Sequence, residues 1–128
     1  MDARNAVSCA LAMARALEGL NTDYRERGFP ECAMRIGIDS GVVVAGSLGS
    51  AGRLQYTVIG ETAVNAQRIE STPAIEHDFD REPARILASE ATCALLSPEF
   101  ETERLGEIPV KGKQGAIGIR KIRVPSRD

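Results

Sequence analysis

Apolar residues recur with a helical period through the first part of the chain. They fall at helical spacing at Ala6, Val7, Ala10, Leu11, Ala14, Leu17 and Leu20. This pattern predicts one long amphipathic helix over about Ala3–Arg27. Asp2 can serve as its N-cap or as an anion in its first turn, and Gly28 followed by Pro30 predicts its end.

Short apolar runs separated by turn residues follow the helix and predict strands. Ala33–Ile38 alternates apolar with smaller or polar residues, and Val42–Val44 is a β-branched run. The Asp-Ser-Gly sequence between them predicts a β-hairpin. Ser47–Arg53 is rich in Gly and Ser and is predicted to be a loop, and Leu54–Ile59 a short strand closed by Gly60.

The second half of the chain is predicted to hold a mixture of helices and strands. In order these are a helix from Glu61 or Thr62 to Ser71, an exposed loop over Thr72–Pro83, a strand over Arg85–Ala88, a helix over Ser89–Leu96, and two strands within Glu103–Val124. Ser89 is placed to cap its helix. The apolar residues of the last strand change parity between Ile119 and Ile122, which predicts a β-bulge near Arg120.

The order of these elements indicates a fold class. Helices and hairpins without a regular strand–helix–strand array predict an α+β sandwich, with a mostly antiparallel sheet and helices packed on one face of it. No repeat, low-complexity tract or shift in composition divides the chain, so residues 1–128 are predicted to form one domain.

Composition and charge exclude several classes of partner. The chain is 43% hydrophobic and 27% charged, which is ordinary for a globular protein. Its net charge of −2 gives no reason to expect nucleic acid or an anionic membrane as a partner. No apolar run approaches the roughly 20 residues that span a bilayer. The cysteines are few, widely spaced and without a Cys-x-x-Cys pair, which predicts reduced thiols and a cytoplasmic location.

Several polar residues are more simply structural than catalytic. The Gly-rich segment 45–50 suggests a phosphate loop, but it lacks a Gly-Lys-Ser/Thr ending, so a hairpin connection is favoured. His77 has no second His or Cys nearby in sequence, which disfavours a metal site. Asp39 lies in a turn where Asp hydrogen-bonds locally to the backbone. The acidic residues between positions 76 and 82 are typical of a solvated loop.

Blocks of sequence further along the chain carry a stronger signal. Residues 34–41 read Met-Arg-Ile-Gly-Ile-Asp-Ser-Gly, and residues 56–70 read Tyr-Thr-Val-Ile-Gly-Glu-Thr-Ala-Val-Asn-Ala-Gln-Arg-Ile-Glu. Ile-Leu-Ala-Ser-Glu-Ala-Thr follows from residue 86, and Leu-Gly-Glu-Ile-Pro-Val-Lys-Gly-Lys from residue 105. In this order and at these separations, the blocks resemble the C-terminal portion of class III adenylyl and guanylyl cyclase catalytic domains.

That resemblance implies a fold and an activity. Such domains are ferredoxin-like sandwiches that act as head-to-tail dimers. In adenylyl cyclases the 3′-hydroxyl of ATP attacks its own α-phosphate and gives 3′,5′-cyclic AMP and pyrophosphate. Two divalent ions, Mg²⁺ or Mn²⁺, are held by two Asp residues of one subunit. The partner subunit supplies the purine contacts, an Asn–Arg pair on a helix, and a Lys for the phosphates.

The resemblance also implies roles for individual residues of this chain. Thr57 matches the residue that reads the purine edge, and a Thr there is similar to adenylyl rather than receptor-type guanylyl cyclases. Arg68 matches the Arg that stabilises charge on the reacting phosphate, a task suited to a guanidinium. Lys111 matches the Lys that contacts the terminal phosphates, with Lys113 beside it.

Two features depart from the pattern of the resemblance. It places Asn four residues before the Arg, but that position is Val64 here and Asn65 is displaced by one, about 100° around a helix. Glu61 stands where Asp is usual, a milder change at an acidic first-turn position.

The metal half of the implied site has no match. Its two Asp residues belong to strands that would precede the long first helix, and Asp2, Asp23 and Asp39 lie in other contexts. No metal ligand is therefore assigned in this chain. We expect the N-terminal strands of the domain to be missing, which would leave a sheet edge and apolar surface exposed.

Three functions remain open from the sequence. The first is an incomplete adenylyl cyclase domain that works with a second copy or a complementing cyclase segment. The second is a degenerate module that dimerises or binds nucleotide without turnover. The third is an interaction domain that binds no nucleotide.

Overall fold

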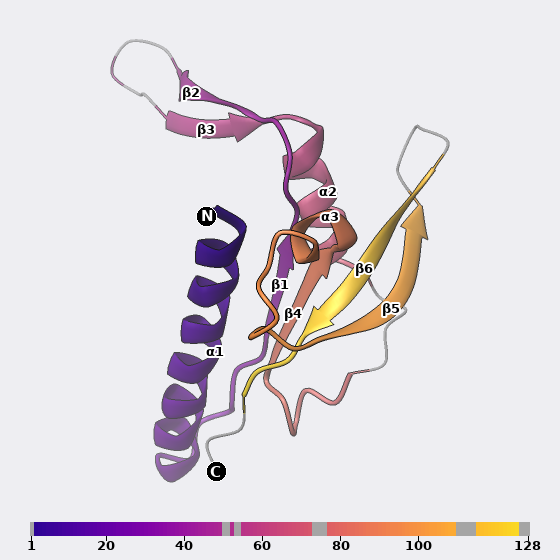
Figure 1. Cartoon of the computed structure of the whole chain (residues 1–128). Coiled ribbons are helices and arrows are strands. Elements are labelled where there is room, and N and C mark those ends of the chain that lie inside the picture. The colour runs from indigo at the N-terminus through magenta and orange to yellow at the C-terminus, as the bar shows by residue number, and fades with distance from the viewer. Residues whose placement is uncertain (1, 50–51, 53–54, 73–76, 110–114, 126–128) are drawn as a thin grey trace.

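The computed structural model describes residues 2–49, 52, 55–72, 77–109 and 115–125. The elements are α1 (Asp2–Glu26), β1 (Met34–Ile38), β2 (Val44–Leu48), β3 (Gln55–Ile59), α2 (Glu61–Glu70), β4 (Ala84–Ser89), α3 (Glu90–Cys93), β5 (Thr102–Pro109) and β6 (Ala116–Ile122). Strands β1, β4, β6 and β5 form one sheet in that order, and β2 and β3 form a separate hairpin that projects from it (Figure 1). The predicted α+β class is confirmed.

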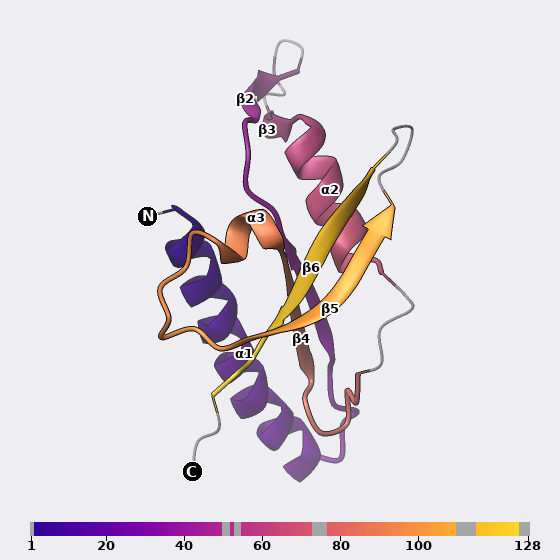
Figure 2. The same ribbon diagram turned by 45° about the vertical axis from the view of Figure 1, so that its right-hand side comes forward.

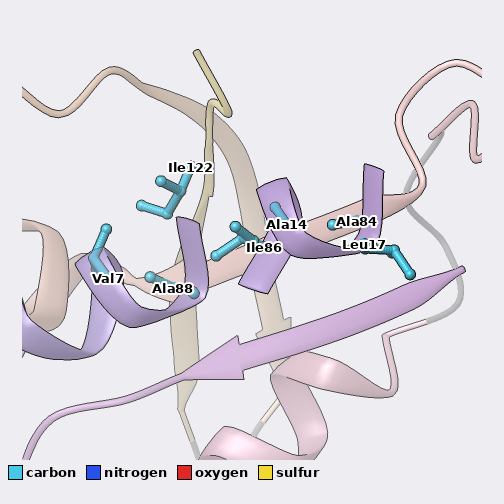
Figure 3. Close-up of a cluster of buried hydrophobic side chains, with 8 residues drawn as sticks. Val7, Ala14, Leu17, Ala84, Ile86, Ala88 and Ile122 are labelled. Carbon is cyan, nitrogen blue, oxygen red and sulfur yellow. The ribbon is translucent and has the colours of Figure 1, made fainter. Parts of the chain in front are cut away.

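The long first helix forms as predicted and covers one face of the sheet. Asp2 lies in its first turn, and Gly28 follows its end with a φ of 76°, a conformation that favours glycine. Small and apolar side chains of α1 pack on the sheet (Figure 3): Val7, Ala10, Ala14 and Leu17 lie against Ala84, Ile86 and Ala88 of β4 and Ile122 of β6. Alanine at the contact lets the helix approach the sheet closely.

Helix α2 covers the opposite face of the same sheet. Ile69 of α2 is fully buried against Leu87 of β4 and Ile119 of β6. Side chains of successive strand residues point to opposite faces, so Leu87 faces α2 while its neighbours in β4 face α1. The expectation that the helices share one face was therefore wrong (Figure 2). All six residues of β4 are buried, because this strand is covered on both faces.

The hairpin predicted for residues 33–44 is not present. Strand β1 pairs in parallel with β4, from Met34 opposite Ala84 to Ile38 opposite Ala88, and β2 pairs with β3 instead. Residues 39–43 carry the chain from one sheet to the other. Pairing with β4 places Ile36 against the α1 core, whereas Val42 is 90% exposed and offers no burial to a local hairpin.

The predicted loop over Ser47–Arg53 begins too early. Ser47 and Leu48 belong to β2, where they pair with Tyr56 and Gln55 of β3. Paired backbone groups therefore extend the strand through the Gly- and Ser-rich sequence. The antiparallel pairing of β2 with β3 agrees with the hairpin favoured over a phosphate loop.

The C-terminal elements follow the prediction with two corrections. The Ser89 hydroxyl accepts a hydrogen bond from the Thr92 N–H at 3.1 Å and caps α3 as predicted, but the α-helix ends at Cys93 and only turns follow. Strands β5 and β6 form the predicted antiparallel pair. Their register shifts between Arg104 and Gly106, opposite Arg120 and Ile119, so the bulge lies near Arg120 as predicted but its extra residue is in β5 and not in β6.

The parity change in β6 has another cause. Its pairing with β4 is unbroken from Ile119 to Ile122. Ile119 packs on the α2 side and Ile122 on the α1 side, so a strand covered on both faces mimics the pattern of a bulge. At the far edge, β1 has β4 as its only strand partner in the described part of the chain. No described helix combines the length and apolar character needed to cross a membrane.

Candidate nucleotide-binding site

Helix α2 carries two of the residues predicted to act on a nucleotide, Asn65 and Arg68. It starts directly after Gly60, whose carbonyl oxygen accepts a hydrogen bond from the Val64 N–H at 3.3 Å. Gly60 has a φ of 148°, which suits glycine at the sharp junction between β3 and α2. The position of Arg68 therefore depends on how the rest of α2 is seated.

A glycine in β1 seats the middle of α2 on the sheet. A Cβ built on Gly37 would overlap the carbonyl oxygen of Ala66 and lie 2.5 Å from the backbone nitrogen of Glu70. Only glycine leaves room for this approach of helix backbone to strand backbone. Ile69 fills the neighbouring position and is fully buried.

Polar contacts fix the C-terminal end of α2. The Arg85 guanidinium donates to the carbonyl oxygen of Glu70 at 2.8 Å, and Arg35 Nε lies 3.3 Å from Glu70 Oε1. The Thr72 hydroxyl donates to the carbonyl oxygen of Arg68 at 2.8 Å. Cations suit this end of a helix because its last carbonyls are unpaired. Burial, and then the nearby Arg35, lower the pKa of the Arg85 guanidinium from its ordinary value.

The side chain of Arg68 remains available although its backbone is fixed. It is partly exposed, and within the described residues it forms no hydrogen bond or ion pair. A guanidinium held on an anchored helix without a carboxylate partner is suited to bind an anion such as phosphate.

Asn65 lies beside Arg68 but closer to the buried side of α2. The helix is continuous from Glu61 to Glu70, so no irregularity corrects the displacement of the Asn. At 100° per residue, Asn65 stands about 60° from Arg68 and about 40° from Ile69 around the axis. Val64 occupies the position implied for the Asn and is 51% exposed.

The remaining predicted residues are placed only in part. Thr57 is a β3 residue whose backbone pairs with Gly46 of β2, and its side chain lies outside the described part of the structure. The chain passes from β3 through Gly60 into α2, so the hairpin and the Arg68 helix are joined directly (Figure 1). Lys111 and Lys113 lie outside the described residues.

The described carboxylates do not fit a two-metal centre. Asp23 pairs with Arg27 at 3.2 Å, and Asp39 Oδ1 accepts the Ser40 N–H at 2.8 Å, the local turn bond predicted for it. Asp2 is exposed in the first turn of α1. No group of three or more His, Cys, Asp or Glu converges among the described residues. His77 contacts the carbonyl oxygen of Glu82 at 2.8 Å through Nε2.

A groove of about 720 Å³ lies away from α2. It is lined partly by Leu11, Phe100 and Val124, and its charges include the ion pair of Lys121 with Glu82 at 3.0 Å. Neither Asn65 nor Arg68, the predicted residues whose side chains are described, lines it. The chemistry that the sequence indicates is therefore at α2 rather than in this groove.

Sequence reasoning missed several residues that build the site. Gly37 was overlooked, although an isolated glycine inside a strand is a known signal of close backbone approach. Arg85 gave no signal, because a charged residue in a predicted strand is ordinarily placed on the exposed face. The hydroxyls of Ser40 and Thr62 also gave none, because their partners, the Thr92 hydroxyl and the Val42 carbonyl oxygen, are distant in sequence.

Comparisons with known proteins agree on a family. The model of the family described as "Adenylate and Guanylate cyclase catalytic domain" matches residues 1–120. Adenylate cyclase 1 of Rhizobium meliloti is 36% identical over 120 residues, which cover 94% of this chain and 17% of the relative. The adenylate cyclase of Anabaena cylindrica is 33% identical over 125 residues, which cover 92% of this chain and 24% of the relative.

Solved structures give the same result. The adenylyl cyclase CyaB from P. aeruginosa superposes with a TM-score of 0.81 at 31% identity, over 99% of this chain and 61% of that one. The guanylyl cyclase Cya2 gives a TM-score of 0.76 at 27% identity, over 98% and 60%. The chain thus spans about a fifth of the curated relatives and about three fifths of the solved domains. The chain therefore belongs to the adenylate and guanylate cyclase catalytic domain family.

Proposed function

We propose that the chain is the substrate-contacting part of a nucleotide cyclase domain of the adenylyl type, in a protein that converts ATP to 3′,5′-cyclic AMP and pyrophosphate. Membership of the family supports the reaction class. The two curated relatives named above are adenylate cyclases, which supports ATP as the substrate. The observation that carries the proposal is Arg68, a guanidinium without a partner among the described residues on a helix anchored at its middle and at its C-terminal end.

Each candidate residue has a distinct task in this proposal. The 3′-hydroxyl gives up its proton to solvent, its oxygen forms a bond to the α-phosphorus, and the bond from that phosphorus to the pyrophosphate oxygen breaks. Negative charge therefore grows on the non-bridging oxygens of the α-phosphate and on the leaving oxygen. Arg68 stabilises that charge with its fork of N–H donors. Thr57 accepts a hydrogen bond from the adenine amino group. Lys111 and Lys113 bind the terminal phosphates, and Asn65 adds an amide to the surface beside Arg68.

A second polypeptide segment completes the site in this proposal. When bound, Mg²⁺ or Mn²⁺ would screen the triphosphate, but the described carboxylates do not converge on a metal position. The carboxylates would therefore come from a second subunit or a complementing cyclase segment. The residues of this chain bind and orient the nucleotide from the opposite side.

An exposed apolar surface on the hairpin supports association with another cyclase domain. We call it the hairpin patch, formed by Val44 of β2 and Ile59 of β3, which lie opposite each other in the pairing of the two strands. Val44 is 69% and Ile59 52% exposed, on a hairpin that projects from the sheet (Figure 1). Contiguous exposed apolar side chains commonly mark protein interfaces.

A second function is favoured by one observation. Asn65 is displaced from its expected position on a helix that shows no compensating irregularity. A degenerate cyclase module that binds nucleotide and dimerises without turnover would tolerate this change. The same experiment separates the two functions.

The test is a complementation assay. The chain is incubated with ATP and Mn²⁺, alone and with a separately produced cyclase segment that carries the two Asp residues, and both cyclic AMP and ATP binding are measured. The proposal expects product on complementation and its loss in Arg68→Ala. Arg15→Ala, which removes an exposed arginine from α1, is the matched control and should keep full activity. Nucleotide binding without product would favour the degenerate module, and neither binding nor product would overturn both.

A further inference from the structure

The linker between the two sheets is held by hydroxyl groups on both sides of Gly41. Residues 39–43 leave the end of β1 and enter the hairpin at Val44. The hairpin belongs to a separate sheet, so its orientation depends on this linker and on its junction with α2. Any residue that fixes the linker therefore fixes where the hairpin stands relative to Arg68.

The first contact ties the linker to the core. The Ser40 hydroxyl lies 2.8 Å from the Thr92 hydroxyl, which is fully buried and lies 3.0 Å from the Ser89 hydroxyl. The Thr92 N–H in turn donates to the Ser89 hydroxyl at 3.1 Å. The beginning of the linker is thus bound to the end of β4 and the start of α3.

The second contact ties the linker to α2. The Thr62 hydroxyl donates to the carbonyl oxygen of Val42 at 3.1 Å. A Cβ on Gly41 would overlap this hydroxyl, so the hydrogen bond forms only because Gly41 has no side chain. Thr62 lies in the first turn of α2, and its hydroxyl bonds to the linker rather than capping its own helix.

The exit from the hairpin lies against its entry. A Cβ on Gly60 would lie 3.5 Å from both the Val42 carbonyl oxygen and the Val43 Cα. The linker therefore packs against the junction between β3 and α2, and the Thr62 hydrogen bond connects α2 to the linker at this point. The same bond ties the start of α2, which carries Arg68, to the linker that leads into the hairpin of Thr57.

We propose that Thr62 is a positioning residue, which sets the orientation of the β2–β3 hairpin relative to α2, with Ser40 anchoring the same linker to the core. This inference rests on the proposed function, in which Thr57 and Arg68 contact one nucleotide. Loss of the bond allows other hairpin orientations. Nucleotide affinity then falls in proportion to the fraction of chains whose hairpin keeps the orientation that binds nucleotide. The net value of one hydrogen bond changes the equilibrium between orientations about fivefold, so affinity falls by at most about fivefold.

The first measurement tests the position of the hairpin without nucleotide. Nitroxide labels are placed at Val58→Cys on the hairpin and at the exposed Cys9 of α1, in a chain with Cys32 and Cys93 changed to Ser. The distance between the two labels is measured by pulsed electron paramagnetic resonance. Labelled chain is diluted with unlabelled chain to suppress contributions between molecules. Thr62→Val should broaden or split the distance distribution, whereas Thr62→Ser should keep the distribution of the parent.

The second measurement tests the consequence for ATP. The Kd for ATP is measured by calorimetry for the chain with the complementing segment. Thr62→Val should weaken binding measurably, by up to about fivefold, and Thr62→Ser should restore the affinity of the parent. Thr22→Val is the control, because it removes a comparable hydroxyl, one that donates to the Glu18 carbonyl oxygen at 3.0 Å on α1, far from the hairpin.

The outcomes separate this inference from the proposed function. Equal distance distributions in Thr62→Val and Thr22→Val overturn the inference, as does a Thr62→Ser variant as weak as Thr62→Val. If the parent binds no ATP, the proposed function fails and the distances still decide the role of Thr62. Gly41→Ala provides a second variant, because its methyl group should displace the Thr62 hydroxyl and broaden the distance distribution. In a chain that already carries Thr62→Ala, Gly41→Ala should change the distribution little.

Discussion

The backbone of Gly37 in β1 lies directly against that of Ala66 in α2, so closely that a Cβ on the glycine would overlap the alanine carbonyl oxygen. Gly37→Ala should therefore destabilise the chain by about 1–3 kcal/mol, the usual cost of forcing an extra group into a packed contact. Urea unfolding followed by circular dichroism measures the change. Gly46→Ala is the control, since a Cβ there meets no atom within 4 Å. Equal stabilities of the two variants would show that α2 can move away from the sheet without cost.

Arg68→Ala should separate binding from stability. The side chain makes no hydrogen bond or ion pair among the described residues, so its loss should change the free energy of unfolding by less than about 0.5 kcal/mol. ATP affinity should nevertheless fall about tenfold or more, because a charged hydrogen bond to phosphate contributes about 1.5–3 kcal/mol. Arg68→Lys should recover only part of this loss, because an ammonium lacks the planar fork. A variant that binds ATP normally would remove Arg68 from the site.

The hairpin patch should govern self-association. Val44→Lys places a charge on a residue that is 69% exposed and packs against no core cluster, so the fold should be retained. Sedimentation velocity should show a shift from dimer to monomer, because desolvating an unpaired ammonium at an interface is costly. Met13→Lys is the control, being 45% exposed on α1. Dimers that survive in Val44→Lys, or that dissociate in Met13→Lys, would place the interface elsewhere.

Local patterns in the sequence were sufficient to predict features that depend on one helix or strand alone. The apolar period of α1, its end at Gly28, and the cap at Ser89 are properties of neighbouring residues, and all three predictions are confirmed. The cyclase resemblance is confirmed by the family match, because it rests on blocks of sequence rather than on contacts.

Pairing between distant residues could not be read in the same way. Asp39, Ser40 and Gly41 have the composition of a tight turn, yet β1 finds its partner some fifty residues away, at Ala84 opposite Met34. Burial of β1 against α1 favours pairing with β4, and the residues of a local turn carry no information about that burial. Arg85 shows the same limit: its buried guanidinium is stable because the end of α2 supplies an acceptor.

Cys93 should react more slowly with alkylating reagents than the other two thiols. Burial raises the pKa of the Cys93 thiol above its ordinary value of 9.0, whereas Cys9 and Cys32 are exposed. The thiolate is the reactive form, and each unit of pKa changes its population about tenfold near pH 8. Mass spectrometry after a timed exposure to iodoacetamide at that pH measures the three rates. They should converge in concentrated urea, and equal rates in the folded chain would contradict the burial of Cys93.

The ion pair between Glu82 and Lys121 should give the stability of the chain a dependence on acid. The ammonium nitrogen lies 3.0 Å from Glu82 Oε2, and its hydrogen bond lowers the pKa of the Glu82 carboxyl below its ordinary value of 4.5. A carboxyl whose pKa is lower in the folded state adds stability above its unfolded pKa. That stability is lost as pH falls from about 4.5 through the folded pKa.

Glu82→Gln should therefore lower the free energy of unfolding at pH 7 but not at pH 3. The difference at pH 7 should stay below about 1 kcal/mol, because the Glu82 side chain is 48% exposed and solvent screens the pair. Urea titrations at several values of pH between 7 and 3 measure the two curves, which should meet at the acidic end. Glu101→Gln, in the segment before β5, is the control and should follow the parent throughout. A constant offset between Glu82→Gln and the parent at every pH would instead assign the effect to packing of the side chain.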